Sequence, residues 1–539
     1  MDRDPQYWSK AKVCGSVVAV AILASCSLAP ARARAATATP RLPTSRPDSA
    51  VAAPTPTATC SCSAACRCTS DEQTVYLRRR KTSLDARLRA NTPFGVLAAS
   101  HTRLRAAAVE SWETGGGACP QVWPSPAATA TPGGAWNLQA IQARQAWSAL
   151  GWPAEALESR TVYVAIVDTG LDISHPDLQG RIAPWRRSFV GPVPDEHVSD
   201  DADHGTAMAG IIAARGNNGA VGIDGIMWGA QIIPCKAGGQ SYGSRTQAIQ
   251  CLEWLADLID RERVRIVAVN FSFGSECCDC AMEAAVARLR DRGVLLIASA
   301  GNGRINSDAR GTCPFYPASY PVSNVISVTG SDRYGNVLYR YGKRTVHLAA
   351  PGVSIPVLVP GGGRSVIPGG SSPAAAHVTG VAALLAAQDP ARTWMETRNL
   401  LLASGAPVAC GGEPACALVT GRILRAWGAN GVGALSCSQQ VVVRRLLPVE
   451  DTLVRRAGET LALRVLSIEC ATARPLAPAI VRRVASSATV QVALRDDGIA
   501  PDPVAGDGEF NGVWVVPAAP NRDYDITVAG ETLRVHVGP

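Results

Sequence analysis

The chain has 539 residues, of which 47% are hydrophobic and 18% are charged. It is several times longer than a typical domain of ~150 residues, so we expect more than one domain, and its apolar fraction excludes a wholly disordered chain. The net charge of +8 is uneven: residues 1–110 hold 16 Lys and Arg against 7 Asp and Glu, and the other 429 residues hold 36 against 37. The main body is close to neutral, so the sequence predicts no nucleic-acid partner.

Residues 1–35 have the pattern of a secretory signal, with a polar start and an apolar run at 13–28 that is short for a stable membrane span. Two cleavage sites compete. Leu23-Ala24-Ser25-Cys26 resembles the lipobox of bacterial lipoproteins, and Ala33-Arg34-Ala35 fits an ordinary signal peptidase. We expect an exported protein that is extracellular, periplasmic or anchored at the cell surface. Its membrane contact would be a lipid on Cys26.

Two further segments separate the signal from the body of the chain. Residues 36–70 form a Pro/Thr/Ala-rich linker that ends in Cys60, Cys62, Cys66 and Cys68. No histidine is near and the spacing lacks the paired two-residue gaps of zinc sites, which favours disulfides or plain low complexity over a metal. Residues 71–134 carry a basic run that suits either the processing site of a pro-segment or the solvated face of a small helix, and they end in a second, Pro/Ala/Gly-rich linker.

Residues 135–440 alternate between buried-strand and helix patterns. The strand runs are Val162–Val167, Val264–Phe271 and Val294–Ala300, and the helical segments are Thr246–Asp260, Ala281–Arg292 and Pro373–Ala387. This alternation predicts an α/β domain whose parallel sheet is covered by helices on both faces. Reactive groups are then expected beyond the carboxyl ends of the strands.

Three motifs place reactive side chains in such positions. Asp168-Thr169-Gly170 follows the first strand run, and His204 opens an Ala/Ile-rich helix. Ser372 stands before Pro373, which predicts Pro373 at the first helical position and Ser372 as the cap. A serine hydroxyl there would also gain from the positive end of the helix dipole. A second Asp-Thr-Gly or Asp-Ser-Gly motif is absent from the sequence, which argues against a two-aspartate protease.

The order Asp, His, Ser resembles that of the subtilisin-like serine proteases. Further segments match the family in the same order along about 300 residues. They are Asn270-Phe271-Ser272-Phe273-Gly274, Ser299-Ala300-Gly301-Asn302, Tyr316-Pro317-Ala318-Ser319-Tyr320-Pro321 and Leu348-Ala349-Ala350-Pro351-Gly352. The resemblance implies an endopeptidase that works through an acyl-enzyme on protein or peptide substrates.

The resemblance also assigns roles. It implies a triad of Asp168, His204 and Ser372, with Asn302 and the Ser372 backbone N–H as the oxyanion hole. It implies that the following residues bind substrate: Ser272, Phe273, Gly274, Ser299, Ala300, Gly301 and Phe315. Phe315 stands by register at the floor of the primary pocket, where many relatives carry glycine, so we expect a pocket too short for large aromatic side chains.

The chain departs from the family pattern at a few positions. Ser371 precedes the nucleophile where threonine is usual, Ala376 replaces a proline, and His347 stands where aspartate is common. None of these removes a reacting atom. Catalysis is expected to need no cofactor. Asp177 matches a position that helps to bind calcium in some relatives, so the alternatives are a structural calcium and a simple turn.

Cysteines are expected in disulfides because the chain is exported. Cys410 and Cys416 are predicted to pair across a Gly/Pro loop, and Cys277-Cys278-Asp279-Cys280 is interpreted as a disulfide-bearing insertion rather than a metal knot. Residues 441–539 carry short alternating strands that predict a β-sandwich. Its acidic loop from Asp496 to Gly508 suits either calcium or ordinary turns.

These patterns predict a secreted or surface-tethered serine endopeptidase with a C-terminal β-sandwich. The alternative is a surface binding protein whose protease-like domain has lost catalysis. The oligomeric state and natural substrate do not follow from the sequence.

Overall fold

The computed structural model describes residues 135–191, 193–216, 222–239, 244–409 and 417–539. The predicted signal, linker and pro-segment lie outside the described residues, as does the predicted pair Cys410 and Cys416. Among the described residues, no helix combines the length and the hydropathy needed to cross a bilayer.

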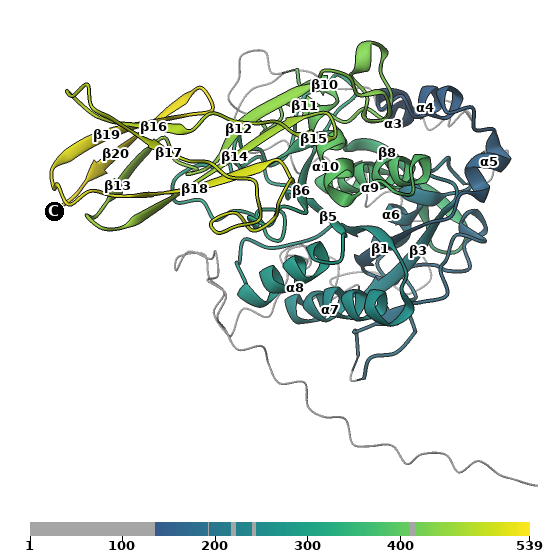
Figure 1. Ribbon diagram of the computed structural model, residues 1–539. Coiled ribbons are helices and arrows are strands. Elements are labelled where there is room, and N and C mark those ends of the chain that lie inside the picture. Colours follow the sequence, from purple (N-terminus) through teal and green to yellow (C-terminus); the bar gives the residue numbers. More distant parts are fainter. Residues whose placement is uncertain (1–134, 192, 217–221, 240–243, 410–416) are drawn as a thin grey trace, which may run out of the picture. The chain divides into compact units, whose positions relative to one another are not determined.

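A nine-stranded sheet with the order β10-β11-β7-β6-β5-β4-β1-β3-β2 forms the centre of the first part (Figure 1). Its strands from β11 to β2 run parallel, and only β10 is antiparallel to its neighbour. The strands are β1 (Val162–Asp168), β2 (Arg187–Ser188), β3 (Ala230–Lys236), β4 (Ile266–Phe271), β5 (Leu295–Ser299), β6 (Val325–Ser331), β7 (Leu348–Pro351), β10 (Ala406–Pro407) and β11 (Arg422–Ile423).

Helices cover both faces of this sheet, as predicted. Along β1, Val164 and Ile166 pack into one apolar cluster with α6 and α9, whereas Ala165 and Val167 pack into a second cluster with α7 and α8. Figure 1 shows these two helix pairs on opposite sides of β1 and β3. The helices are α3 (Trp136–Ala140), α4 (Ala143–Ala149), α5 (Ala154–Ser159), α6 (His204–Ala213), α7 (Arg245–Glu262), α8 (Cys280–Arg290), α9 (Ser371–Gln388) and α10 (Trp394–Ala403).

The chain changes direction across the sheet at β1. It leaves β1 through α6 to reach β3 on one side, then returns through α7 to β4 on the other side of β1. Such a switch opens a crevice beyond the carboxyl ends of the strands. Asp168, Phe271 and Ser299 end the adjacent strands β1, β4 and β5 at this edge.

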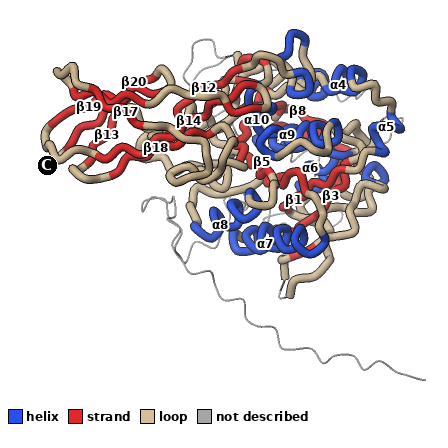
Figure 2. Tube along the Cα trace, viewed as in Figure 1, coloured by secondary structure: helices blue, strands red, loops and turns tan. Residues whose placement is uncertain are grey.

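Residues 441–539 fold as two antiparallel-dominated sheets with an apolar cluster between them, which agrees with the predicted sandwich. Figure 2 shows strands and loops, without a helix, in this part of the described chain. One sheet joins β14 (Thr460–Glu469) to β12 (Val441–Leu447), β15 (Thr472–Ala473) and β18 (Glu509–Val515). The other has the order β13 (Thr452–Arg455), β20 (Glu531–Val537), β19 (Arg522–Val528), β16 (Ala479–Arg483) and β17 (Thr489–Val492).

Apolar packing continues from the helices into the sandwich. Val442, Leu446, Leu466 and Ile468, from β12 and β14, belong to the same cluster as α9 and α10. The domain boundary at residue 440 stays a prediction from the sequence.

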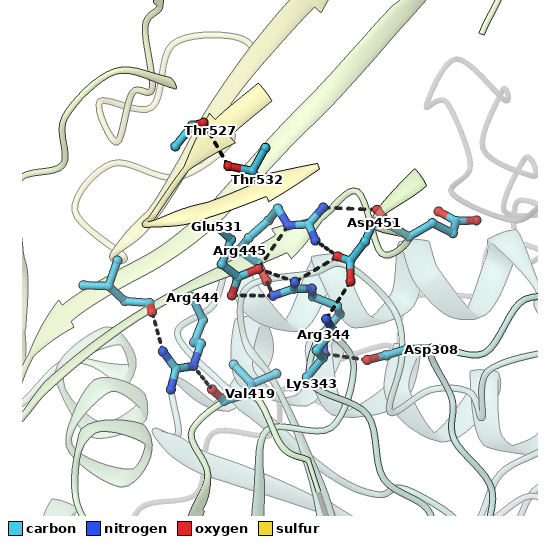
Figure 3. Close-up of polar contacts among 12 residues, drawn as sticks. Asp308, Lys343, Arg344, Val419, Arg444, Arg445, Asp451, Thr527, Glu531 and Thr532 are labelled. Atoms are coloured by element: carbon cyan, nitrogen blue, oxygen red, sulfur yellow. Dashed lines mark hydrogen bonds and ion pairs between the residues drawn. The ribbon is translucent and has the colours of Figure 1, made fainter. Parts of the chain in front are cut away.

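Buried charges also join these two parts of the chain. Arg344, from the segment after β6, and Arg445, from β12, both contact the carboxylates of Asp451 and Glu531 (Figure 3). The two arginine side chains are 1% and 0% exposed. Burial alone would raise the pKa of Asp451, but Lys343 and Arg445 lower it to about 2. Of these contacts, those of Arg344 join the α/β part to the sandwich, and removing their carboxylates would leave a buried guanidinium uncompensated.

Candidate active site

Asp168 and His204 meet at the carboxyl end of β1. His204 is the first residue of α6, and its Nδ1 lies 2.7 Å from Oδ1 of Asp168. Asp168 is 2% exposed, and the same oxygen accepts the backbone N–H of Thr169 at 2.7 Å. The imidazole side chain keeps 32% of its surface exposed. The histidine is therefore anchored on one nitrogen and open to solvent.

Electrostatics favour the charged form of this imidazole. Burial alone would lower the pKa of His204, but the charge of Asp168 and its hydrogen bond outweigh burial and raise the pKa above its ordinary value. A carboxylate that stabilises the imidazolium in this way is what a histidine base requires when it takes a proton.

Asp200 supports this pair, and the sequence analysis did not identify it. Its Oδ1 accepts the hydroxyl of Thr169 at 2.8 Å, and its Oδ2 accepts the backbone N–H of Thr206 at 2.8 Å. The Thr169 hydroxyl in turn accepts the N–H of Gly205 at 3.0 Å. One carboxylate thus joins the end of β1 to the first turn of α6, where backbone N–H groups lack helical partners. A loop aspartate four residues before a histidine has no sequence signature.

The serine pair lies at the start of α9, but the predicted cap is wrong. The helix begins at Ser371 with Gly370 as its N-cap, so Ser372 and Pro373 are inside the first turn. The side chain of the distant Asn302 bonds this first residue, because its Oδ1 accepts the backbone N–H of Ser371 at 2.8 Å and its hydroxyl at 2.9 Å. Asn302 thus satisfies one of the terminal N–H groups that have no partner within the helix.

The two serines have different environments. Ser371 is 1% exposed, and its hydroxyl accepts the N–H of Gly301 at 3.1 Å. Ser372 is less buried, and its hydroxyl donates to the carbonyl of Ser272 at 2.8 Å. Of the two hydroxyls, that of Ser372 is the accessible one, which agrees with the sequence register.

The remaining predicted substrate residues gather at the ends of β4 and β5. Ser272, Phe273 and Gly274 continue from β4, and Ala300 and Gly301 follow Ser299 at the end of β5. Gly301 adopts a φ of +100°, which favours glycine.

Phe315 occupies the space between these two segments. A Cβ atom built on Gly274 would lie 2.7 Å from the Phe315 ring, and one built on Gly301 would lie 3.1 Å from it. The Phe315 side chain is buried, at 6% exposure. We call the region bounded by Gly274, Gly301 and Phe315 the primary pocket; the ring stands between its two glycine walls.

Arg340 lies close to the Phe315 ring and is a second residue that the sequence analysis missed. Its guanidinium carbon is 5.7 Å from the centre of the Phe315 ring, and its side chain is 3% exposed. The guanidinium donates to the Cys313 carbonyl at 3.1 Å and pairs with the carboxylate of Glu276. Arg340 therefore links the segment after Gly274 to the segment that carries Phe315.

Two other histidines have strongly lowered pKa values: His377, which is fully buried, and His347, which is partly buried. Burial lowers the pKa of His377 to about 4, and the ring lies 2.7 Å from the Pro373 carbonyl and 2.9 Å from the Asn137 amide. Burial, followed by the charge of Arg398, lowers the pKa of His347 to about 3. Both imidazoles are thus neutral near pH 7 and support the fold.

The residues considered for calcium take backbone partners. Asp177 is fully buried, and its Oδ2 accepts the N–H of Ile223 at 2.9 Å. In the sandwich, Asp496 accepts the N–H groups of Gly506 and Gly508 at 2.7 and 3.0 Å, as an aspartate in a turn does, and calcium at this loop stays a prediction. Within the described ranges, no group of three or more His, Cys, Asp or Glu residues could hold a metal ion.

Comparison with known proteins agrees with this geometry. The subtilase family model matches residues 159–422. Fervidolysin from Fervidobacterium pennivorans is 33% identical over 298 residues, which cover 49% of this chain and 39% of that protein. Subtilisin-like protease 2 from Plasmodium falciparum is 30% identical over 264 residues, 46% of this chain and 18% of that protein. The chain thus spans well under two thirds of these two relatives.

A shorter relative is covered almost completely. Subtilisin Savinase from Lederbergia lenta is 32% identical over 269 residues, which are 49% of this chain and 89% of that protein. With the parallel sheet and the family match, this coverage shows that the chain belongs to the subtilase family of serine proteases.

Proposed function

We propose that this protein is a serine endopeptidase with Asp168, His204 and Ser372 as its triad. The observation that carries the proposal is the 2.7 Å contact between Asp168 and His204 at the carboxyl end of β1. The sheet order supports the proposal. Strand β4 is the neighbour of β1, and the carbonyl of Ser272, directly after β4, accepts the Ser372 hydroxyl. The family membership favours the same activity.

In this proposal His204 removes the proton from the Ser372 hydroxyl as it attacks the peptide carbonyl. Asp168 holds Nδ1 of the ring, which leaves Nε2 for the serine proton, and it stabilises the imidazolium that forms. The ring then protonates the leaving amine, and water hydrolyses the acyl-enzyme by the same steps in reverse. The Ser372 hydroxyl leaves the Ser272 carbonyl when substrate binds.

Asn302 and the backbone N–H of Ser372 are proposed to stabilise the oxyanion. The Asn302 oxygen is engaged by Ser371, so its amide N–H groups remain for the substrate. The N–H of Ser372 lies in the first turn of α9, where backbone donors lack helical partners. Donors held in place before the reaction stabilise developing charge without reorganisation.

We propose further that the substrate is a protein or peptide with a small residue on the acyl side of the cleaved bond. Substrate backbone would lie along Ser272–Gly274 and Ser299–Gly301. The Phe315 ring between Gly274 and Gly301 leaves little depth for a large side chain.

Export is the other part of the proposal. It rests on the signal pattern of residues 1–35 and on the disulfides Cys235–Cys251 and Cys437–Cys470, which suit an oxidising compartment. The lipid on Cys26, the pro-segment and a calcium ion at Asp177 stay predictions.

The proposal is tested by labelling the folded protein with a serine-directed phosphonate. We expect stoichiometric modification of Ser372, mapped by mass spectrometry, and loss of labelling and peptidase activity in Ser372→Ala. Ser371→Ala is the matched control, because it removes the adjacent hydroxyl and should still label. If correctly folded protein is not labelled, the catalytically inactive binding protein becomes the better interpretation.

A further inference from the structure

A buried lysine bonds the loop that leads into His204. Lys236 is the last residue of β3, and in the register of the sheet it is paired with Asp168 of β1. Its side chain is only 6% exposed. A lysine is rarely buried to this depth unless its ammonium has polar partners, because an unpaired buried charge is very costly. The partners of Lys236 therefore show what it holds in place.

Both partners of Lys236 belong to residues 199–203, which we call the histidine loop. The Nζ atom donates to the carbonyl of Ser199 at 2.5 Å and to Oδ1 of Asp201 at 2.9 Å. The Asp201 side chain is 52% exposed, so the buried member of this ion pair is the lysine. The ammonium thus bonds the loop at two points, one on each side of Asp200.

The residue between these two points carries the carboxylate that reaches the proposed triad. Oδ1 of Asp200 accepts the Thr169 hydroxyl, and its Oδ2 accepts the N–H of Thr206, both at 2.8 Å. Burial lowers the pKa of His204, but the charges of Asp168 and Asp200, together with the Asp168 hydrogen bond, raise it above its ordinary value. A displaced Asp200 would change both the support of α6 and the charge around the imidazole. The charged side chains on the histidine loop and on β1 and β3 are Asp168, Asp200, Asp201, Asp203 and Lys236.

The histidine loop has a backbone that needs to be held. Asp203, the N-cap of α6, has a φ of +65°, in the left-handed region that residues with a side chain seldom adopt. Such a conformation persists where the surrounding contacts fix it. At the other end of the loop the packing is close, since a Cβ atom on Gly170 would lie 2.4 Å from the Ser199 carbonyl oxygen. A shift of the loop would therefore be transmitted both to the segment after Asp168 and to the start of α6.

We infer that Lys236 is a positioning residue for the proposed triad: it fixes the histidine loop and, through Asp200, holds His204 in the orientation that accepts the Ser372 proton. The inference rests on the proposed function, because it gives Lys236 a role in the same reaction. The segments proposed to bind substrate follow β4 and β5, which lie on the other side of β1 from β3. Loss of the lysine should therefore affect the rate of the chemical step rather than the binding of substrate.

Lys236→Met tests the inference, because it keeps an unbranched apolar side chain while removing the ammonium. We expect kcat to fall about 10–100-fold with KM similar, since a displacement of about 1 Å at a reacting group can cost about 10²-fold. The serine-directed phosphonate should still modify Ser372 completely, but more slowly, because its attack needs the same base. Lys343→Met is the matched control. It also removes one lysine charge and one ion pair, that with Asp451, and should keep the parent rates.

The pH–rate profile separates positioning from a merely structural role. If Asp200 moves away from His204, the pKa of His204 falls, so the rising limb of the profile should move to lower pH in Lys236→Met. Loss of a positive charge by itself would move the limb to higher pH. Asp200→Asn should move it to lower pH as well, and adding Lys236→Met to Asp200→Asn should move it no further. A limb that moves to higher pH in Lys236→Met, or two shifts that add, would overturn the inference.

A second variant covers the case in which Lys236→Met does not fold. Lys236→Met combined with Asp201→Leu replaces the whole ion pair by apolar side chains, which proteins often tolerate better than one unpaired charge. It should show the same slower labelling, and labelling at the parent rate in this folded variant would refute the role of Lys236. The parent chain separates the two proposals. If folded parent protein is not labelled at Ser372, the proposed function fails; if it is labelled and folded Lys236→Met is labelled equally fast, the inference about Lys236 fails alone.

Discussion

Replacing Phe315 should change which peptide bonds the protease cleaves. The ring stands between Gly274 and Gly301, where a Cβ atom on either glycine would lie about 3 Å from it. Phe315→Ala removes the ring while keeping both walls. The space freed is about one aromatic side chain, so a phenylalanine on the acyl side of the cleaved bond could enter it.

The size of the change follows from the area that the substrate buries. Fully burying a phenylalanine side chain contributes about 1.5–3 kcal/mol, and about 1.4 kcal/mol corresponds to a factor of ten. We therefore expect the ratio of kcat/KM for an acyl-side Phe peptide to that for the Ala peptide to rise about 10–100-fold. Losing a buried phenylalanine also costs stability, about 3–5 kcal/mol, so the folded fraction must be measured with each rate.

The assay uses two internally quenched peptides that differ only in that residue. Phe510→Ala is the control, because Phe510 is a similarly buried phenylalanine, at 9% exposure, in β18 of the sandwich. It should lower stability without changing the ratio. The reasoning is refuted if the parent enzyme already prefers the Phe peptide, or if folded Phe315→Ala keeps the parent ratio.

Three further predictions follow from the site and its surroundings. Asn302→Ala should lower kcat by about 10²–10³ with KM similar, as expected for a lost oxyanion donor; an unchanged kcat with a raised KM would contradict that role. Asp168→Asn should lower kcat by about 10⁴ and move the rising limb of the pH–rate profile to lower pH, because Asp168 raises the pKa of His204; an unmoved limb would argue against the coupling. Burial, followed by the charge of Glu509, raises the pKa of Asp507 to about 7. The folded state therefore favours the protonated carboxyl, so the stabilising contribution of Asp507 is complete below about pH 4 and is lost as the pH rises through about 7. In a Ser372→Ala background, Asp507→Asn should therefore raise the melting temperature more at pH 8.5 than at pH 5, and an equal effect at both pH values would be inconsistent with this titration.

The strands and helices around the site could be predicted because their signals are local. Val162–Val167 is a short β-branched run, and the structure places β1 at Val162–Asp168. The predicted helix at Thr246–Asp260 corresponds to α7, which begins one residue earlier and ends two residues later. Burial on both faces of a parallel sheet leaves a continuous apolar run that a sequence displays directly.

Local signals did not reveal contacts made by side chains that are distant in the sequence. Ser372 was expected to cap α9, but the helix begins at Ser371, whose N–H donates to the Asn302 side chain. Arg340 was overlooked for the same reason: it lies far along the chain from Glu276, and only the packed fold brings its guanidinium to that carboxylate.

The sequence alone was enough to predict the order of the elements, the likeness to subtilases and the site residues Asp168, His204 and Ser372. Each of these is encoded by residues that are neighbours in the chain. The folded structure was needed to see how Asp200 ties β1 to α6, how Phe315 and Arg340 lie at the primary pocket, and how the buried Arg344 contacts the sandwich. Those contacts join residues from separate elements, and their energies depend on burial and distance, which exist only once the sheet order has brought the elements together.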